Sequence, residues 1–93
     1  MTPKQLLQIA RFARPEYEWK VTRDGTVMSE IGMFNLDSRA DREAVQIRLF
    51  REKGVKINEV QRRGKVVYQA KRLSGSVRES ASFEDLVLDC VGE

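Results

Sequence analysis

Two alternating runs joined by a glycine turn constrain the fold of this chain more than any other feature. In the first run Val55 and Ile57 alternate with polar residues, and the second run, residues 66–71, has the same period. Side chains of a β-strand point alternately to two faces, so a period of two predicts strands. Gly64 lies between the runs and supplies the turn, because glycine takes positive φ at no steric cost. Residues 55–72 are therefore predicted to form a β-hairpin. Ser74-Gly75-Ser76 is then either a loop or a break before a short extension of the strand.

A second alternating run lies closer to the N-terminus. Tyr17, Trp19 and Val21 share one face of a predicted strand. The Asp-Gly dipeptide at 24–25 is a strong hairpin signal, and the return strand is expected over about 26–31. Because the other face of the first strand is charged, we expect its aromatic side chains to face the core and not to form an open platform for stacking bases. Tyr68 of the later hairpin is likewise expected to be a core residue.

Three helices are predicted from capping signals and helical spacing. The first begins with the capping box Thr2-Pro3-Lys4-Gln5 and ends before Pro15. The second follows Ser38 and ends at Gly54. Its predicted buried face consists of Ala40, Ala44, Ile47 and Phe50, widened by Val45 and Leu49. The third follows Ser82, and its predicted inner face consists of Phe83, Leu86, Val87, Cys90 and Val91.

The resulting element order is α-β-β-α-β-β-α, and a chain of 93 residues is expected to form a single domain, 1–93. Short turns join consecutive strands, which makes each pair antiparallel. The predicted fold class is therefore α+β, with an antiparallel sheet of about four strands packed with three helices. Alternation in the first and fourth strands implies that one face of the sheet is solvated. Whether a helix covers part of that face is not decided by the alternation. An exposed sheet edge permits a homodimer by strand pairing.

The chain lacks the residues that zinc binding and general-base catalysis usually require. The chain has no histidine and one cysteine, so neither the usual zinc ligands nor the commonest general base is present. Cys90 falls on the apolar side of the last helix between acidic neighbours, which favours a buried structural thiol over a nucleophile. We predict no catalytic residue, no metal, no cofactor and no enzymatic activity. No apolar run reaches the roughly 20 residues of a bilayer span, so the expected location is cytoplasmic, without membrane contact.

Charge is distributed unevenly along the chain although the net charge is only +3. Residues 1–47 sum to zero, residues 48–78 carry +8, and residues 79–93 carry −5. Two interpretations follow. In one, the basic hairpin is solvated and its side chains partly pair with the acidic last helix. In the other, the hairpin binds a polyanion, either nucleic acid or an acidic protein surface. The residues predicted to bind the partner are Arg62, Arg63, Lys65, Lys71, Arg72 and Lys56.

Several short sequence segments and the order of the predicted elements also resemble a known family. An N-terminal helix precedes an aromatic strand at Tyr17-Glu18-Trp19-Lys20, and the central helix ends at Lys53-Gly54. A basic hairpin follows, and then the segment 80–91, in which Ser and Ala residues precede a short helix with a buried cysteine. In these features the chain resembles the phage ABA sandwich domain family of small bacteriophage and prophage proteins. The resemblance implies a phage origin and a sheet with helices on both sides.

The resemblance also shapes the expected function. Small phage proteins without catalytic residues often bind and block a host machine, so we expect a non-enzymatic accessory protein that binds a host protein or nucleoprotein stoichiometrically. An inhibitor of bacterial immunity of the anti-CRISPR kind is one form of this function. The alternative is a nucleic-acid-binding module that uses the basic hairpin 55–72.

Overall fold

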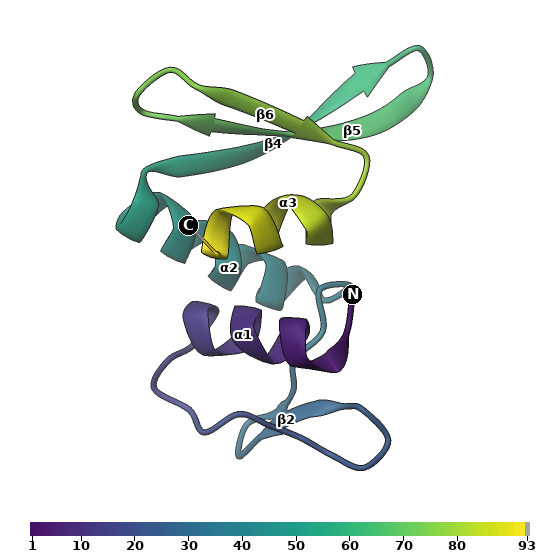
Figure 1. Cartoon of the computed structure of the whole chain (residues 1–93), viewed down its shortest axis with the longest axis vertical. Helices are drawn as coiled ribbons and strands as arrows, with labels where there is room; N and C mark the ends of the chain where they lie inside the picture. Colours follow the sequence, from purple (N-terminus) through teal and green to yellow (C-terminus); the bar gives the residue numbers. More distant parts are fainter. Residues whose placement is uncertain (93) are drawn as a thin grey trace. The chain divides into compact units, whose positions relative to one another are not determined.

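A computed structural model describes residues 1–92 and contains three helices and two three-stranded antiparallel sheets. The chain divides into two compact units, Met1–Val45 and the part from Gln46 onward, and the central helix crosses the boundary between them. Figure 1 shows the elements, which in chain order are α1 (Pro3–Ala13), β1 (Lys20–Val21), β2 (Val27–Ser29), β3 (Gly32–Met33), α2 (Arg39–Lys53), β4 (Val55–Arg62), β5 (Lys65–Arg72), β6 (Val77–Ser80) and α3 (Phe83–Val91). The α+β class and the three helices are thus confirmed. That residues 1–93 form a single domain stays a prediction.

The sheets differ from the single sheet of about four strands that was predicted. The stretch 26–31 is not one strand, because a turn at Glu30 and Ile31 divides it and a third strand begins at Gly32. Gly32 has a φ of 115°, which only glycine adopts readily. A further strand, β6, follows the turn at 74–76 and pairs with β5. Each hairpin therefore gains a short third strand of its own, and the element order becomes α-β-β-β-α-β-β-β-α.

The first unit packs α1 against the strands β1 and β2. The side chain of Thr2 accepts a hydrogen bond from the Gln5 N–H, and the Gln5 side chain accepts one from the Thr2 N–H, so the predicted capping box is present. Trp19 is only 4% exposed and meets the ring of Phe34 edge-on at 5.5 Å. Its indole N–H donates to the Arg14 carbonyl at 2.9 Å. The prediction that Trp19 is a core residue is confirmed, while Tyr17 is half-buried.

Helix α2 buries only part of the face that was predicted. Ile47 and Phe50 are 58% and 55% exposed, whereas Val45 and Leu49, which were expected to widen the face, are fully buried. The buried stripe continues to Asp41, one turn before Val45. The Asp41 carboxylate accepts a hydrogen bond from the backbone N–H of Asn35 and lies 3.4 Å from the Arg14 guanidinium. These polar contacts satisfy the carboxylate away from water and so turn a charged position inward.

The second unit consists of the β4–β5 hairpin, β6 and α3 together with the end of α2. A two-residue turn, Arg63-Gly64, joins β4 to β5, and both residues have positive φ, 52° and 78°. Positive φ at both central positions is the geometry of a type I′ turn, which suits the twist of a hairpin. Ser82 caps α3 by accepting a hydrogen bond from the Asp85 N–H, as predicted. The buried side chains of α3 are Phe83, Leu86, Val87 and Cys90.

Candidate binding face of the second sheet

The sheet β4–β5–β6 has two faces of different character. Helix α3 packs against β5 and β6 (Figure 1), and Tyr68 meets Phe83 edge-on at 5.5 Å. Residues paired directly across an antiparallel ladder share a face, and every second residue lies on that face. The register pairs Ile57 with Ala70 and Glu59 with Tyr68. These positions therefore lie on the face that α3 covers, and the core prediction for Tyr68 agrees with its contact to Phe83.

The opposite side of the sheet is called the open face here. It is formed by the residues of β4, β5 and β6 whose side chains point away from α3. These are Lys56, Asn58, Val60, Arg62, Lys65, Val67, Gln69, Lys71, Val77 and Glu79. The prediction of one solvated sheet face agrees with this arrangement, because the basic members of the face are all exposed.

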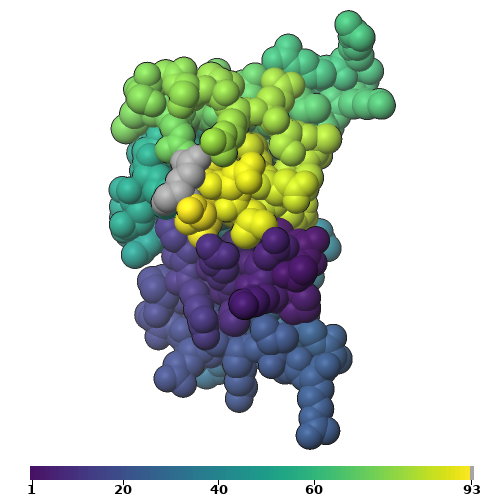
Figure 2. All heavy atoms as spheres, viewed as in Figure 1, coloured from purple at the N-terminus to yellow at the C-terminus, as the bar shows by residue number. Residues whose placement is uncertain are grey.

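Four of the six residues predicted to bind a partner lie on the open face. Lys56 is directly opposite Lys71 at one end, and Arg62 is directly opposite Lys65 at the other. Arg63 is exposed in the turn that follows. This turn projects from the rest of the second unit, as the green atoms at the upper right of Figure 2 show.

Arg72 is separated from the other predicted binding residues. It lies opposite Val55, which is buried, and so belongs to the face that α3 covers. The Arg72 side chain is close enough to Cys90 to hydrogen-bond its thiol. Arg72 and Lys71 lie on opposite faces, because a step of one residue along a strand moves the side chain to the other face. That Arg72 binds a partner stays a prediction. Burial raises the pKa of the Cys90 thiol, and the charges of Arg72 and Arg78 only partly oppose this effect.

The charge of Arg62 is partly neutralised by Glu79 of β6. The guanidinium reaches both carboxylate oxygens of Glu79, through Nε at 3.2 Å and through a terminal nitrogen at 3.3 Å. The side-chain amide of Gln69 donates to the same carboxylate at 3.3 Å. The hydrogen bonds from Gln69 and Arg62 lower the pKa of Glu79 below its ordinary value. The sequence assigned Glu79 to the acidic C-terminal segment, and it gave no bounds for the short strand extension that was one alternative after 74–76.

An ion pair between a basic residue and the acidic last helix is present, but the basic residue belongs to β6 and not to the hairpin. Arg78 of β6 lies 3.8 Å from Asp89 of α3. Of the basic residues on the open face, Arg62 binds a strand carboxylate and not a helix carboxylate. The solvated interpretation is therefore met only in part: Arg62 of the hairpin pairs with a carboxylate of β6, and Arg78, which reaches the last helix, lies outside the hairpin 55–72.

Lys56 and Lys71 form the most unusual pair on the open face. Like charges directly opposite each other on adjacent strands repel and destabilise the sheet. Among the described residues, no carboxylate lies within ion-pair distance of either ammonium group. An anion placed between the two would relieve the repulsion and receive donors from both sides.

The centre of the open face is apolar. Val60 is directly opposite Val67, and both are half-buried. Val77 of β6 is 54% exposed. Asn58 and Gln69 form the next pair along the sheet and offer amide donors and acceptors. The face thus has an apolar middle with a basic pair at each end of the hairpin.

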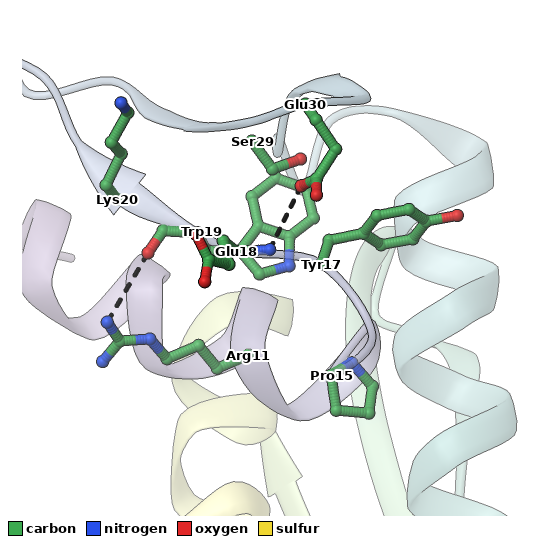
Figure 3. A pocket seen from close by; sticks show the side chains of 8 residues that line it. All are labelled: Arg11, Pro15, Tyr17, Glu18, Trp19, Lys20, Ser29 and Glu30. Carbon is green, nitrogen blue, oxygen red and sulfur yellow. Dashed lines mark hydrogen bonds between the residues drawn. The ribbon is translucent and has the colours of Figure 1, made fainter.

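The first unit has a depression of about 850 Å³, shown in Figure 3. It is lined by Arg11, Pro15, Tyr17, Glu18, Trp19, Lys20, Ser29 and Glu30. A carboxylate oxygen of Glu30 already accepts the Glu18 N–H at 3.1 Å, and Arg11 donates to the Trp19 carbonyl at 3.5 Å. The lining mixes both signs of charge, and its polar groups partly satisfy one another. It therefore favours no class of ligand.

Within residues 1–92, the side chains of Cys, Asp and Glu nowhere gather in threes in a way that could hold a metal ion. No helix in the same range has the length and apolar character that a bilayer span requires.

Neither a protein-family model, nor a curated protein, nor a solved structure matches the chain. The resemblance to the phage ABA sandwich family therefore stays a prediction, carried by the residues that suggested it.

Proposed function

We propose that this chain is a non-enzymatic binding protein that uses the open face of its second sheet to hold an acidic surface of another protein. The observation that carries the proposal is an apolar centre, Val60 and Val67, on the same face as Lys56 and Lys71, which have no ion-pair partner among the described residues. Protein interfaces combine an apolar centre with a polar rim in this way. Carboxylates of the partner would meet the lysines, and its apolar side chains would cover the valines.

Two features favour a protein partner over nucleic acid. Single-stranded nucleic acid is held by aromatic side chains on which bases stack, and the aromatic residue of this sheet, Tyr68, packs on Phe83 at the covered face. Duplex binding rests on several free cations that contact phosphates, and one cation of the open face, Arg62, is already bound to Glu79. Direct nucleic-acid binding by the hairpin 55–72 is therefore the alternative function, which the experiment below distinguishes from protein binding.

The proposed biological setting rests on the resemblance to small phage and prophage proteins. In that setting the chain would act in the cytoplasm of a bacterial host, by stoichiometric binding to a host protein or nucleoprotein. An inhibitor of bacterial immunity of the anti-CRISPR kind would block its target through the open face. Such an inhibitor needs no catalytic group, because occupying the target's surface suffices.

The test compares variants of the open face in a nuclease-treated bacterial lysate. One variant, Lys56→Ala with Lys71→Ala, removes the basic pair, and a second, Val60→Ser with Val67→Ser, removes the apolar centre. Arg23→Ala, an exposed cation of the first unit, is the matched control. We expect wild type and the control to capture the same protein from the lysate, and both double variants to lose it. Calorimetry with that protein should give a one-to-one complex.

A nucleic-acid function would give a different pattern. Binding to a labelled duplex or single strand would weaken steeply between low and moderate salt. It would also be lost in a variant with Arg62, Arg63 and Lys65 all replaced by alanine, and retained by the valine variant. That pattern, or a protein partner that binds both double variants as well as wild type, would refute the proposed function.

A further inference from the structure

Strand β4 lies at an edge of the second sheet, since the strand order is β4–β5–β6. The strand is eight residues long. A long edge strand presents unpaired N–H and C=O groups that can pair with another strand. Beside its first residues lies a groove of about 670 Å³, lined by Gln46, Ile47, Phe50, Arg51, Lys56 and Ile57. The edge is therefore bordered by open space where β4 begins.

We propose that β4 pairs antiparallel with β4 of a second copy of this chain, so that the two sheets join into one. The inference does not depend on the proposed function, because it concerns the edge of the sheet and not its open face.

The turn determines which backbone groups point toward the free edge. Arg62 and Lys65 flank a two-residue turn, so they form a hydrogen-bonded pair. Hydrogen-bonded and non-hydrogen-bonded positions alternate along an antiparallel ladder. The even-numbered residues of β4 therefore direct their N–H and C=O groups toward β5. The odd-numbered residues, which are Val55, Ile57, Glu59 and Gln61, direct theirs outward.

Overlap, symmetry and charge together select the register. A two-fold axis perpendicular to the sheet keeps equivalent faces together, so some residue of β4 must lie opposite its own copy. Centres at Asn58 and Glu59 pair seven of the eight residues of β4, more than any other centre does. Centring the pair on Glu59 would place two carboxylates together and Lys56 opposite Arg62 on both sides of the axis. Centring it on Asn58 pairs Val55 with Gln61 and Ile57 with Glu59, and no like charges lie directly opposite each other. Each of these pairs uses the outward groups and exchanges two hydrogen bonds.

The Asn58 register also joins complementary surfaces. Glu59 of one copy lies opposite Ile57 of the other, where Arg51 and Lys56 line the groove and no carboxylate does. Lys56 and Arg62 of the two copies become diagonal neighbours, and Glu79 offsets their repulsion because it already binds Arg62. The basic tip of each hairpin also comes next to the groove of the other copy, and Glu59 is the carboxylate of this register that offsets the repulsion there.

Cysteine cross-linking tests the register directly. In a Cys90→Ser background, Asn58→Cys places two thiols at the two-fold axis in a non-hydrogen-bonded pair, where Cα atoms are about 4.5 Å apart, within disulfide range. Lys56→Cys is the matched control on the same face, because it lies opposite Val60 and not opposite itself. We expect mild oxidation to give nearly complete disulfide dimer for the first variant and at least tenfold less for the second. Equal cross-linking of both variants, or none of the first, overturns the register.

Molar mass in solution tests the pairing itself. We expect wild type to have twice the chain mass by light scattering at micromolar concentration. Glu59→Pro removes an outward N–H without removing a β5 hydrogen bond, and should halve the mass, whereas Glu59→Ala should retain the dimer. A circular dichroism spectrum like that of wild type shows that the proline variant is folded. If that variant does not fold, the cross-linking of Asn58→Cys and Lys56→Cys tests the pairing instead. A wild-type chain with the mass of one copy over the whole concentration range overturns the proposal and leaves the β4 edge to a strand of a different protein.

Discussion

Lys56 and Lys71 lie directly opposite each other on β4 and β5, and no described carboxylate neutralises them. A chain selected for stability alone would gain from an acidic residue at either position. The proposed binding of an anionic partner would relieve this repulsion, so stability and the proposed binding should respond in opposite directions to one substitution.

Lys71→Glu should stabilise the protein and weaken its binding. It replaces a repulsive cross-strand pair by an attractive one, for an expected gain of about 0.5–1 kcal/mol in the free energy of unfolding. Urea denaturation at low salt measures the gain, which should shrink at high salt as the charges are screened. Lys65→Glu is the control, because its opposite residue Arg62 already binds Glu79. An unchanged urea midpoint for Lys71→Glu would contradict the repulsion.

Arg63→Asn should also stabilise the protein. Among the described residues, Arg63 is the non-glycine residue with positive φ, 52°, and a side chain in this region costs about 1–2 kcal/mol. Asparagine tolerates the conformation best, and Asn-Gly is the preferred type I′ sequence, so we expect a gain of roughly 0.5–1 kcal/mol. Arg63→Val should instead lower the urea midpoint, since a β-branched residue is strained there. The two variants remove the same charge, so a shift of the same sign in both would show that charge and not backbone conformation decides the effect.

Asp41→Ala should destabilise the first unit by about 2 kcal/mol, the scale of a hydrogen bond to a charged group. The substitution leaves the Asn35 N–H without its acceptor and removes the carboxylate beside Arg14. Glu43→Ala on the exposed side of α2 is the control, with an expected change below about 0.5 kcal/mol. Thermal denaturation of both variants tests the prediction, and equal melting temperatures would mean that the buried carboxylate contributes nothing.

The link between Arg62 and Glu79 should respond to acid. The pKa of Glu79 is lowered in the folded state from an ordinary value of 4.5 by hydrogen bonds from Gln69 and Arg62. Its contribution is therefore present above pH 4.5 and is lost as the pH falls through the folded-state value. Glu79→Gln should be less stable than wild type at neutral pH, and the difference should shrink in more acidic solution. A difference that stays constant from neutral to strongly acidic pH would rule out this linkage.

Local signals in the sequence predicted the pieces of the fold well. The capping residues Thr2 and Ser82 and the turn glycine Gly64 each act through neighbours within a few positions, so the sequence is enough to interpret them. Strand β3 was missed and β6 was predicted only as an alternative to a loop, because strands of two and four residues show too little alternation to identify. The buried face of α2 was predicted only in part, since contacts with Asn35 and Arg14 make Asp41 a buried position.

The candidate site was predicted in composition but not in arrangement. Periodicity was enough to place Lys56 and Lys71 on opposite strands, but not to show that they face each other, because the register depends on the length of the turn. The association of Arg62 with Glu79 could not be predicted before β6 was known. Arg72 was grouped with the others because charge was counted along the chain and not by face.

Because side chains and backbone groups alternate along β4, this one strand contributes to the open face, to the hydrophobic core and to the edge of the sheet. Its even-numbered side chains form the open face, two of its odd-numbered side chains, Val55 and Ile57, are buried, and the outward backbone of the odd residues forms the edge. Substitutions at Lys56, Asn58 or Val60 can therefore accumulate while the hydrophobic interior and the hydrogen-bond ladder stay as they are. The chemistry of the open face can therefore change through a handful of surface residues, with little risk to folding.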